Sequence, residues 1–485
     1  MLWIALYLSA LPLQLAQRGT KDERPLVISD GPANRPLVLC ANPSARDLGV
    51  KPGMTAAAAR ALTGELIVLP RNPNHEAQAL HNLAAWAYQF TPGVVVHGPD
   101  GLLLDVAAAL KLHKGLPNLL VRLRREMLEL GYHAACGVAP TPGAAWLFAK
   151  ARHTGRAVRT CTDHAALADR LTDIPLDLFD WPQELLSKLA ALGVRRIGQC
   201  LALPRDGFTQ RFGKAPLLEL DRALGAVPDP RPCFTPPEKF SSHAEFGFEV
   251  NDALALLFPL KRLLKELEGF LRGRGAGVQQ WHLALEQSGR RATRITLGVV
   301  APERNAERLL GLARERLART QLMAPVLALR VEADEFFAYD ERSQSWLPDP
   351  QQTTQGWHYL IDKLASRLGE DKVSRLQSVD DHRPERSWRR TAAAGPKAQP
   401  LPLLQAPRPL WLLRTPRTLL TRNGQPLCQG QLRLIAGPER IESGWWDGRP
   451  VGRDYFVARN PHGETLWIYR EHRHSDAWYL HGLFA

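Results

Sequence analysis

The sequence contains few cysteines, and no two of them form a Cys-x-x-Cys pair. Six occur in 485 residues, at positions Cys40, Cys136, Cys161, Cys200, Cys233 and Cys428. A zinc ribbon needs closely spaced pairs of ligands, and disulfide frameworks belong to short chains rich in cysteine. The spacing excludes both and favours a reducing compartment, so we expect a cytoplasmic protein without a metal site.

A long uninterrupted apolar run is also missing. The apolar segment of residues 1–15 has no basic region before it, and Tyr7, Pro12 and Gln14 interrupt it. These features argue against a signal peptide, and we expect a buried first β-strand that ends near Pro12. No other segment approaches the roughly 20 apolar residues that cross a bilayer, so no membrane association is predicted.

Acidic residues are fewer than basic residues. The chain has 49 Asp and Glu residues and 62 Lys and Arg residues, which gives a formal charge of +13 and a pI near 9.7. Clustered cations gain affinity for a polyanion by releasing its counterions. Nucleic acid is therefore the leading candidate for a partner, although charge alone does not decide it. The length and the 45% hydrophobic content predict a multidomain chain.

Strand and helix patterns alternate through the first third of the chain. Short apolar runs predict strands at residues 25–28, 36–40, 91–96 and 133–138, and amphipathic patterns predict helices at residues 75–89 and 116–130. Thr55 is expected to cap an alanine-rich helix over residues 56–62, because its hydroxyl can accept a free N-terminal amide. The fold class predicted from this order is α/β (α+β).

Two motifs carry a resemblance to a known family. Ala45-Arg46, Gly49-Val50 and Gly53-Met54 are similar to the fingers signature of Y-family (translesion) DNA polymerases, with glycines where a tight turn tolerates positive φ. The segment from Cys136 to Pro142, followed by Ala149-Lys150, resembles a palm motif of the same family. Thr141 and Pro142 replace its usual Asn-Lys and point to the ImuB subgroup.

The resemblance implies a right hand with an added C-terminal part. It assigns a palm to residues 1–16 and 70–165, fingers to 17–69, a helix-hairpin-helix thumb to 166–232 and a little finger to 238–345. A linker would cover residues 346–405, and a β-rich domain residues 406–485. Within residues 238–345 the patterns predict helices at 252–271 and 305–319 and strands at 279–286, 294–300 and 326–333.

The catalytic carboxylates of this family are mostly missing. The resemblance places Leu6, Leu8 and Gly101 at acidic positions, and only Asp100 remains. Two-metal phosphoryl transfer needs several carboxylate oxygens to hold two cations about 3.5–4 Å apart. An active polymerase would have to recruit Asp100, Asp105 and another acid such as Asp30. Strand alternation, however, places Asp105 on the face opposite to Asp100.

A helix-hairpin-helix is expected near residues 189–204. Gly193 and Gly198 would let backbone amides approach a phosphate, and Arg195 and Arg196 would add charge there. The alternative is an ordinary helical hairpin with a glycine cap. A helix-hairpin-helix repair enzyme that acts on a damaged base is a remote third possibility, because no catalytic Lys or Asp can be assigned after the hairpin.

Five further arginines are candidate phosphate contacts of the predicted little finger. We expect them in turns and at strand ends, where they could reach a DNA backbone. The alternative is a solvated, solubilising surface. The residues are Arg272, Arg274, Arg290, Arg291 and Arg294.

The predicted linker contains a candidate peptide for binding a sliding clamp. The sequence of residues 399–404 is similar to the Gln-x-Leu-x-Leu-Phe type of motif, in which the glutamine reaches backbone groups and the leucines fill an apolar pocket. The candidate residues are Gln399, Leu401, Leu403 and Leu404. A Gln/Pro/Leu hexamer also arises easily in a proline-rich linker.

Aromatic residues and arginines alternate in the last eighty residues. Trp445-Trp446, Trp467 and Trp478-Tyr479 lie in blocks that resemble the tail of the ImuB subgroup. These rings could stack on bases or on a protein, but we expect most of them to form a small core. His472 and His474 lack a third ligand, so a metal site is not expected there.

The subgroup resemblance implies a non-catalytic adaptor without a cofactor. Such a protein would act on damaged primer–template DNA in the nucleoid. It would link the sliding clamp to an error-prone C-family DNA polymerase and to a RecA-like partner, ImuA.

Overall fold

The computed structural model describes residues 1–18, 24–156, 160–339, 357, 360–365, 367–369, 372–392, 407–473 and 475–484. The chain divides into two compact units, Met1–Arg367 and Leu368–Ala485. The fold is mixed α/β in several sheets, as the sequence predicted. The finer division of the first unit into palm, fingers, thumb and little finger stays a prediction.

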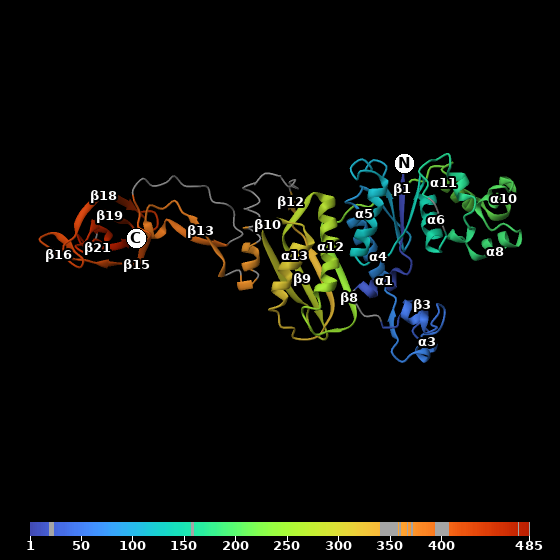
Figure 1. Cartoon of the computed structure of the whole chain (residues 1–485), viewed down its shortest axis with the longest axis horizontal. Coiled ribbons are helices and arrows are strands. Elements are labelled where there is room, and N and C mark those ends of the chain that lie inside the picture. The colour runs from blue at the N-terminus through green and yellow to red at the C-terminus, as the bar shows by residue number, and fades with distance from the viewer. Residues whose placement is uncertain are drawn as a thin grey trace. The chain divides into compact units, whose positions relative to one another are not determined.

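A four-stranded antiparallel sheet forms the centre of the first unit. Its order is β5 (Gly93–His97), β6 (Gly101–Asp105), β1 (Trp3–Tyr7) and β7 (Ala135–Ala139). Side chains alternate between its two faces. One face packs on α4 (Pro73–Ala87) and α5 (Leu116–Glu129), and the other packs on α6 (Pro142–His153), so helices cover the sheet on both sides (Figure 1).

The first strand is shorter than the sequence suggested. We expected a strand up to about Pro12, but β1 ends at Tyr7 and helix α1 (Leu11–Arg18) follows. Pro12 lies in the first turn of that helix, where its missing N–H costs nothing. Leu11, Leu13 and Leu15 are buried residues of α1. The apolar run therefore continues past β1 because this helix packs into the core, and not because the strand is longer.

A small three-stranded sheet carries the fingers-like motif. Its order is β3 (Leu37–Ala41), β2 (Leu26–Asp30) and β4 (Ile67–Pro70), with helices α2 (Pro43–Asp47) and α3 (Ala56–Leu62). Thr55 caps α3 through its side chain, as predicted. Gly49 and Gly53 have φ of +88° and +84°, which confirms the expected turns.

Short helices follow the central sheet. They are α7 (Leu167–Leu171), α8 (Gln183–Ala191), α9 (Ile197–Leu201), α10 (Arg205–Phe212) and α11 (Lys214–Leu224). Their buried residues share one apolar cluster with α6. The cluster joins this helical segment to the central sheet.

A second sheet with two helices completes the first unit. Its main path is β10 (Thr293–Glu303), β9 (Ala276–Gln287), β11 (Val326–Ala333) and β8 (Phe240–Val250), and β12 (Phe337–Ala338) pairs with β9. Helices α12 (Leu257–Arg274) and α13 (Ala306–Leu317) share a core with the sheet. These elements confirm the alternation predicted for this region.

The second unit is β-rich, as predicted. Its main sheet has the order β15 (Trp411–Thr418), β21 (Trp478–Leu483), β20 (Thr465–Glu471), β19 (Val451–Arg459) and β18 (Arg433–Ser443). A small hairpin, β16 (Leu420–Arg422) with β17 (Gln425–Leu427), lies in the same unit.

Part of the predicted linker is folded. Strands β13 (Ser374–Ser378) and β14 (Trp388–Ala392) form an antiparallel hairpin in the second unit. Arg383, in its connection, pairs with Asp381 at 2.7 Å and with Asp447 at 2.8 Å. The contact with Asp447, 64 positions away in the chain, attaches the hairpin to the rest of the second unit, and sequence composition does not show it. Among the described residues, no helix is long and apolar enough to span a membrane.

Candidate functional site

The residues of the predicted catalytic position meet at one end of β1. In the register of the central sheet, Leu6 lies opposite Leu102 and Tyr7 opposite Gly101. Asp100 lies in the turn between β5 and β6, and its backbone carbonyl accepts a hydrogen bond of 2.7 Å from the amide of Leu8. The fold thus assembles Leu6, Leu8, Asp100 and Gly101 from segments almost 100 residues apart.

Leu6 and Leu8 lie in the core and do not line an open cleft. Both side chains are fully buried and belong to the apolar cluster between the sheet and helices α4 and α5. Leu83 and Leu123 belong to the same cluster. A charged group at either position would enter this core without water, at a cost of several kcal/mol.

Trp146 of α6 occupies the space beside Gly101. A Cβ atom at position 101 would lie 2.3 Å from Cζ3 of Trp146 and 2.5 Å from the carbonyl oxygen of Leu6. The Trp146 ring also meets Tyr7 edge-on at 5.4 Å and His97 at 4.4 Å between ring centroids. Three aromatic rings therefore surround the position at which active relatives are expected to hold a carboxylate.

Asp100 is half-buried and lies near an ion pair. Lys150 of α6 binds Asp180 at 2.7 Å and lies close enough to Asp100 to affect its titration. Burial raises the pKa of Asp100, an effect that Lys150 opposes and Asp180 adds to. Burial, with Arg231 and Lys150 nearby, lowers the pKa of His97 to about 4, so this imidazole is neutral at pH 7.

The alternative carboxylates lie elsewhere. Asp105 is at the far end of β6, opposite Trp3, and its side chain accepts from the amide of Ala107 at 3.2 Å. Asp30 ends β2 and pairs with Arg71 at 3.1 Å. In the described parts of the chain, no group of three His, Cys, Asp or Glu ligands forms around Asp100.

The helical hairpin has no free amides at its two predicted glycines. The Gly193 amide donates to the carbonyl of Ala190 at 3.0 Å, and the Gly198 amide donates to that of Thr172 at 3.0 Å. Gly198 lies inside α9 and has a packing role, because a Cβ there would lie 2.4 Å from Thr172 Cγ2. Phosphate contact through these amides is thus not available in this conformation.

The hairpin arginines differ from each other. Arg196 pairs with Asp173 at 2.7 Å, whereas Arg195 is exposed and its backbone amide is held by the side chain of Gln199. A role of Arg195 and Arg196 in DNA contact stays a prediction, with Arg195 as the more accessible cation.

The five arginines of the second sheet fall into two groups. Arg272 and Arg274 lie in the last turn of α12, not in a turn or at a strand end as expected; Arg272 pairs with Glu268 at 2.8 Å, and Arg274 stacks on Phe270. Arg290 and Arg291 are exposed between β9 and β10. Arg294 is the second residue of β10 and pairs with Glu332 at 3.3 Å. Their contact with DNA stays a prediction.

The clamp-binding candidates Gln399, Leu401, Leu403 and Leu404 lie outside the described residues.

In the second unit most of the aromatic residues are core, as expected. Tyr455, Trp467 and Tyr469 are buried, with Tyr455 stacked on Trp467 at 4.1 Å. Trp445 and Trp446 are exposed.

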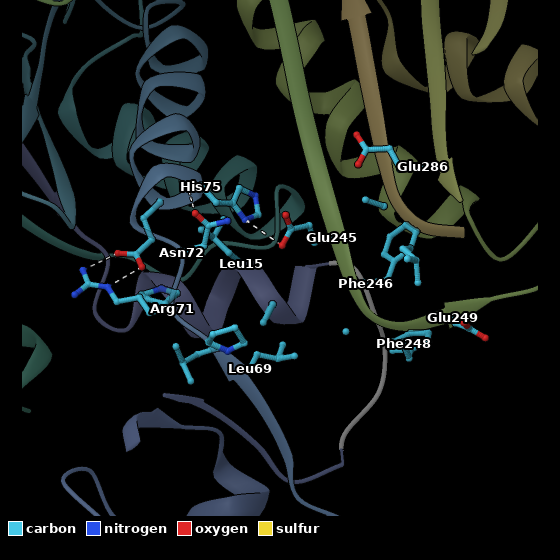
Figure 2. A pocket seen from close by; sticks show the side chains of 18 residues that line it. Leu15, Leu69, Arg71, Asn72, His75, Glu245, Phe246, Phe248, Glu249 and Glu286 are labelled. Carbon is cyan, nitrogen blue, oxygen red and sulfur yellow. Dashed lines mark hydrogen bonds and ion pairs between the residues drawn. The ribbon is translucent and has the colours of Figure 1, made fainter. Parts of the chain in front are cut away.

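Sequence reasoning missed the features that depend on long-range contact. Trp146 was not singled out, although its place in a motif-bearing helix was a signal. A cavity of about 700 Å³ beside His75 and Glu245, bordered by α1, α4 and β8, was also not foreseen (Figure 2). Its residues are far apart in the sequence and carry no common spacing.

Comparisons with known proteins agree with the resemblance seen in the sequence. Residues 7–150 match the model of the impB/mucB/samB family. The chain is 29% identical to Protein ImuB of Caulobacter vibrioides over 468 residues, which cover 90% of this chain and 100% of that protein. It is 25% identical to DNA polymerase IV of Dehalococcoides mccartyi over 329 residues, 62% of this chain and 82% of that one.

Among solved structures, one match is the Y-family DNA polymerase chimera Dbh-Dpo4(243-245)-Dbh. The TM-score is 0.40 and the identity 20%, with 69% of this chain and 98% of the chimera covered.

Proposed function

We propose that this chain, which resembles ImuB and carries an impB/mucB/samB-family domain, is a non-catalytic polymerase-like adaptor in DNA-damage-induced translesion synthesis. It would bind damaged primer–template DNA while another polymerase performs the synthesis. The proposal is carried by one observation. At the turn that meets the end of β1, Asp100 supplies a carboxylate, but Gly101 beside it packs against Trp146 and Tyr7, and Leu6 and Leu8 are sealed in the core on the opposite face of the sheet.

The physical argument concerns charge and space. Two divalent cations need several oxygen ligands at about 2.0–2.2 Å, and Asp100 offers one carboxylate. Lys150 lies near that carboxylate and is paired with Asp180 at 2.7 Å, so the second acidic group near Asp100 is already engaged by a protein cation. Trp146 fills the volume that a side chain at position 101 would need.

The proposed partners follow from the resemblance to the ImuB subgroup. They are the bacterial sliding clamp, bound through Gln399, Leu401, Leu403 and Leu404, an error-prone C-family DNA polymerase and the RecA-like protein ImuA. The site of action would be the nucleoid in the cytoplasm. The net charge of +13 supports contact with DNA.

An active lesion-bypass polymerase with relocated ligands is the competing function. It would need Asp30 or Asp105 beside Asp100, but these two carboxylates are held in other sheets or strand ends, as described above. Base excision by a helix-hairpin-helix repair enzyme would show itself as base release from lesion-bearing duplex.

Primer extension tests the absence of catalysis. The purified full chain is incubated with primer–template, nucleotides and Mg²⁺ or Mn²⁺, beside an Asp100→Ala variant. We expect no extension by either protein. Extension by the wild type that disappears in Asp100→Ala would overturn the adaptor proposal, because it would show that Asp100 holds a catalytic metal.

A pull-down with purified sliding clamp tests the proposed peptide. We expect retention of the wild type and loss of retention in a Gln399→Ala/Leu403→Ala double variant. Equal retention of the two proteins would remove the peptide at residues 399–404 from the proposal without affecting the argument about catalysis.

A further inference from the structure

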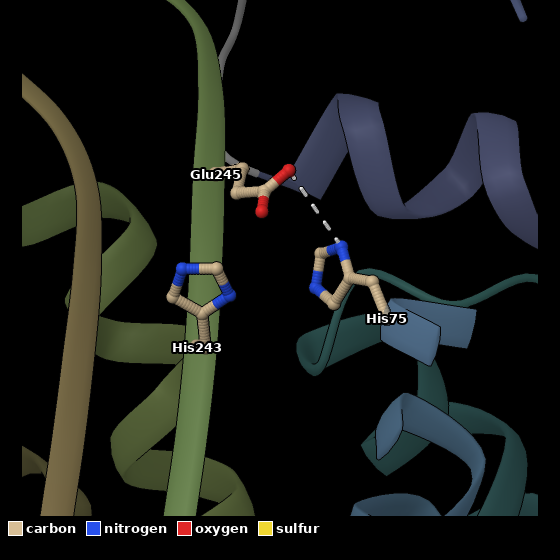
Figure 3. Close-up of side chains that lie close together, drawn as sticks. All are labelled: His75, His243 and Glu245. Carbon is tan, nitrogen blue, oxygen red and sulfur yellow. Dashed lines mark ion pairs between the residues drawn. The ribbon is translucent and has the colours of Figure 1, made fainter. Parts of the chain in front are cut away.

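Two histidines and a glutamate from distant segments meet at the border of the cavity near α4 and β8. His75 lies in the first turn of α4, while His243 and Glu245 lie on β8. Figure 3 shows the His75 ring directed toward the carboxylate of Glu245, with His243 beside both. One potential ligand atom from each of the three side chains lies within 4.8 Å of the others.

Local structure fixes the directions of these side chains. His243 and Glu245 are two residues apart on one strand, so they project from the same face. The amide of His75 donates to the side chain of Asn72, which caps α4, at 3.1 Å. The helix start therefore holds His75 against the strand, with the two imidazole centroids 5.2 Å apart.

The potential metal-ligand atoms of this cluster make few hydrogen bonds or ion pairs within the fold. His243 Nε2 is buried and has no hydrogen-bond partner in the described structure; the carboxylate of Glu286 is 3.9 Å away and already accepts from Arg330 at 2.8 Å. Among the described residues, the charged partner of Glu245 within ion-pair distance is His75, at 4.0 Å. A lone pair and a negative charge are thus left without a strong partner.

We propose that His75, His243 and Glu245 bind one first-row transition-metal dication, with Zn²⁺ as the reference ion. Imidazole nitrogen with carboxylate oxygen is a ligand set that suits Zn²⁺, Co²⁺ or Ni²⁺ and does not suit Mg²⁺ or Ca²⁺, which prefer oxygen ligands. The site is distinct from the turn at Asp100 and does not depend on the proposed function.

The geometry requires a modest closure. A tetrahedral Zn²⁺ with bonds of about 2.1 Å holds its ligand atoms about 3.4 Å apart, so the cluster must contract by roughly 1.4 Å from 4.8 Å. The two imidazoles are 15% and 18% exposed and Glu245 is 54% exposed, so the carboxylate can rotate inward. Water from the adjoining cavity would supply the fourth ligand.

Metal binding here would join two parts of the first unit. His75 belongs to the segment that matches the impB/mucB/samB model, residues 7–150, whereas His243 and Glu245 lie beyond it. An ion that binds the folded chain only would stabilise it in proportion to the logarithm of its free concentration over its dissociation constant. The melting temperature of the wild type should therefore rise with Zn²⁺.

The test uses the full chain after treatment with a chelator and dialysis. Zn²⁺ is titrated by calorimetry, and Co²⁺ serves as a visible-absorption probe of ligand geometry. The variants are His243→Ala and Glu245→Gln, and the controls are His81→Ala, on the same helix as His75, and His472→Ala, in the His-x-His pair. We expect one tight Zn²⁺ site that both controls retain and that both variants weaken roughly tenfold or more.

Using two variants keeps the test decisive even if one of them does not fold. Glu245 is largely exposed, so Glu245→Gln leaves packing intact even if His243→Ala unfolds the chain. Supporting results are a Zn²⁺-dependent rise in melting temperature in the wild type and its loss in Glu245→Gln. Absence of a tight Zn²⁺ site in the wild type, or equal Zn²⁺ affinity in the wild type and Glu245→Gln, would overturn the proposal.

Discussion

Trp146 and Gly101 form a contact that only a residue without a side chain permits. The position of a Cβ at residue 101 is blocked by a ring atom at 2.3 Å and by a backbone oxygen at 2.5 Å. A ring can turn away, but the carbonyl of Leu6 belongs to a paired strand and cannot move without breaking the sheet. The packing around residue 101 thus leaves no space for a side chain, which supports the proposed absence of a carboxylate at this position.

Replacing Gly101 by glutamate should destabilise the protein without creating activity. We expect Gly101→Glu to lower the free energy of unfolding by about 1–3 kcal/mol or more, because the side chain overpacks a filled site. Calorimetric unfolding measures this change, and primer extension measures activity.

Gly207→Ala is the matched control for that substitution. Gly207 lies in α10 with open space around the position of its Cβ, so alanine should raise helix stability by up to about 1 kcal/mol. A Gly101→Glu variant as stable as the wild type would show that Trp146 yields easily and would contradict the packing argument.

At the scale of elements, a buried ion pair connects the central sheet region to the second sheet. Arg18 ends α1 and binds Glu266 of α12, which also accepts a hydrogen bond from Ser242 of β8. Arg18 donates further to the Tyr132 hydroxyl at 2.7 Å and to the Leu130 carbonyl at 2.8 Å. The pair is almost completely buried, with 5% and 1% of the two side chains exposed.

Removing Glu266 should cost far more than removing an exposed glutamate. We expect Glu266→Ala to lower the free energy of unfolding by about 3–5 kcal/mol, because Arg18 would remain charged and buried without its partner. Glu184→Ala, which breaks an exposed pair with Lys188, should cost about 0–0.5 kcal/mol.

An apolar replacement of both partners separates the two causes. Arg18→Met/Glu266→Met should be less destabilised than Glu266→Ala, since no unpaired charge remains. If Glu266→Ala and Glu184→Ala unfold at the same denaturant concentration, α12 is not held by this pair.

At the scale of the whole molecule, the excess positive charge contributes to the proposed DNA binding only where the cationic side chains are accessible. Arg290 and Arg291 are exposed between β9 and β10 and have no side-chain partner among the described residues. Arg272 is engaged by Glu268. Accessible cations displace counterions from phosphates, whereas a cation already paired with a carboxylate contributes less.

The salt dependence of DNA binding should therefore distinguish these arginines. We expect Arg290→Gln/Arg291→Gln to reduce the slope of log K against log salt by about 1.8 on duplex primer–template, if each residue contacts one phosphate. Fluorescence anisotropy at several NaCl concentrations measures the slope, and Arg272→Gln is the control that should leave it nearly unchanged. An unaltered slope in the double variant would remove this turn from the DNA contact surface.

Short-range features of the structure could be predicted from the sequence. Thr55 caps α3, Gly49 and Gly53 have positive φ, and the strands and helices of residues 240–333 follow their patterns. Each of these depends on a few neighbouring residues, through hydrogen bonds of the helix end, backbone sterics or the period of apolar side chains. The identities of Leu6, Leu8 and Gly101 were likewise visible in the sequence.

Tertiary structure alone decided what those residues contact. The sequence did not indicate that Leu6 and Leu8 are sealed under α4 and α5, that Trp146 covers Gly101 or that Gly198 packs on Thr172. It also gave no sign that His75 would meet His243 and Glu245. Such contacts join residues from 26 to 170 positions apart, and their geometry is set by sheet register and helix packing, which no local pattern encodes.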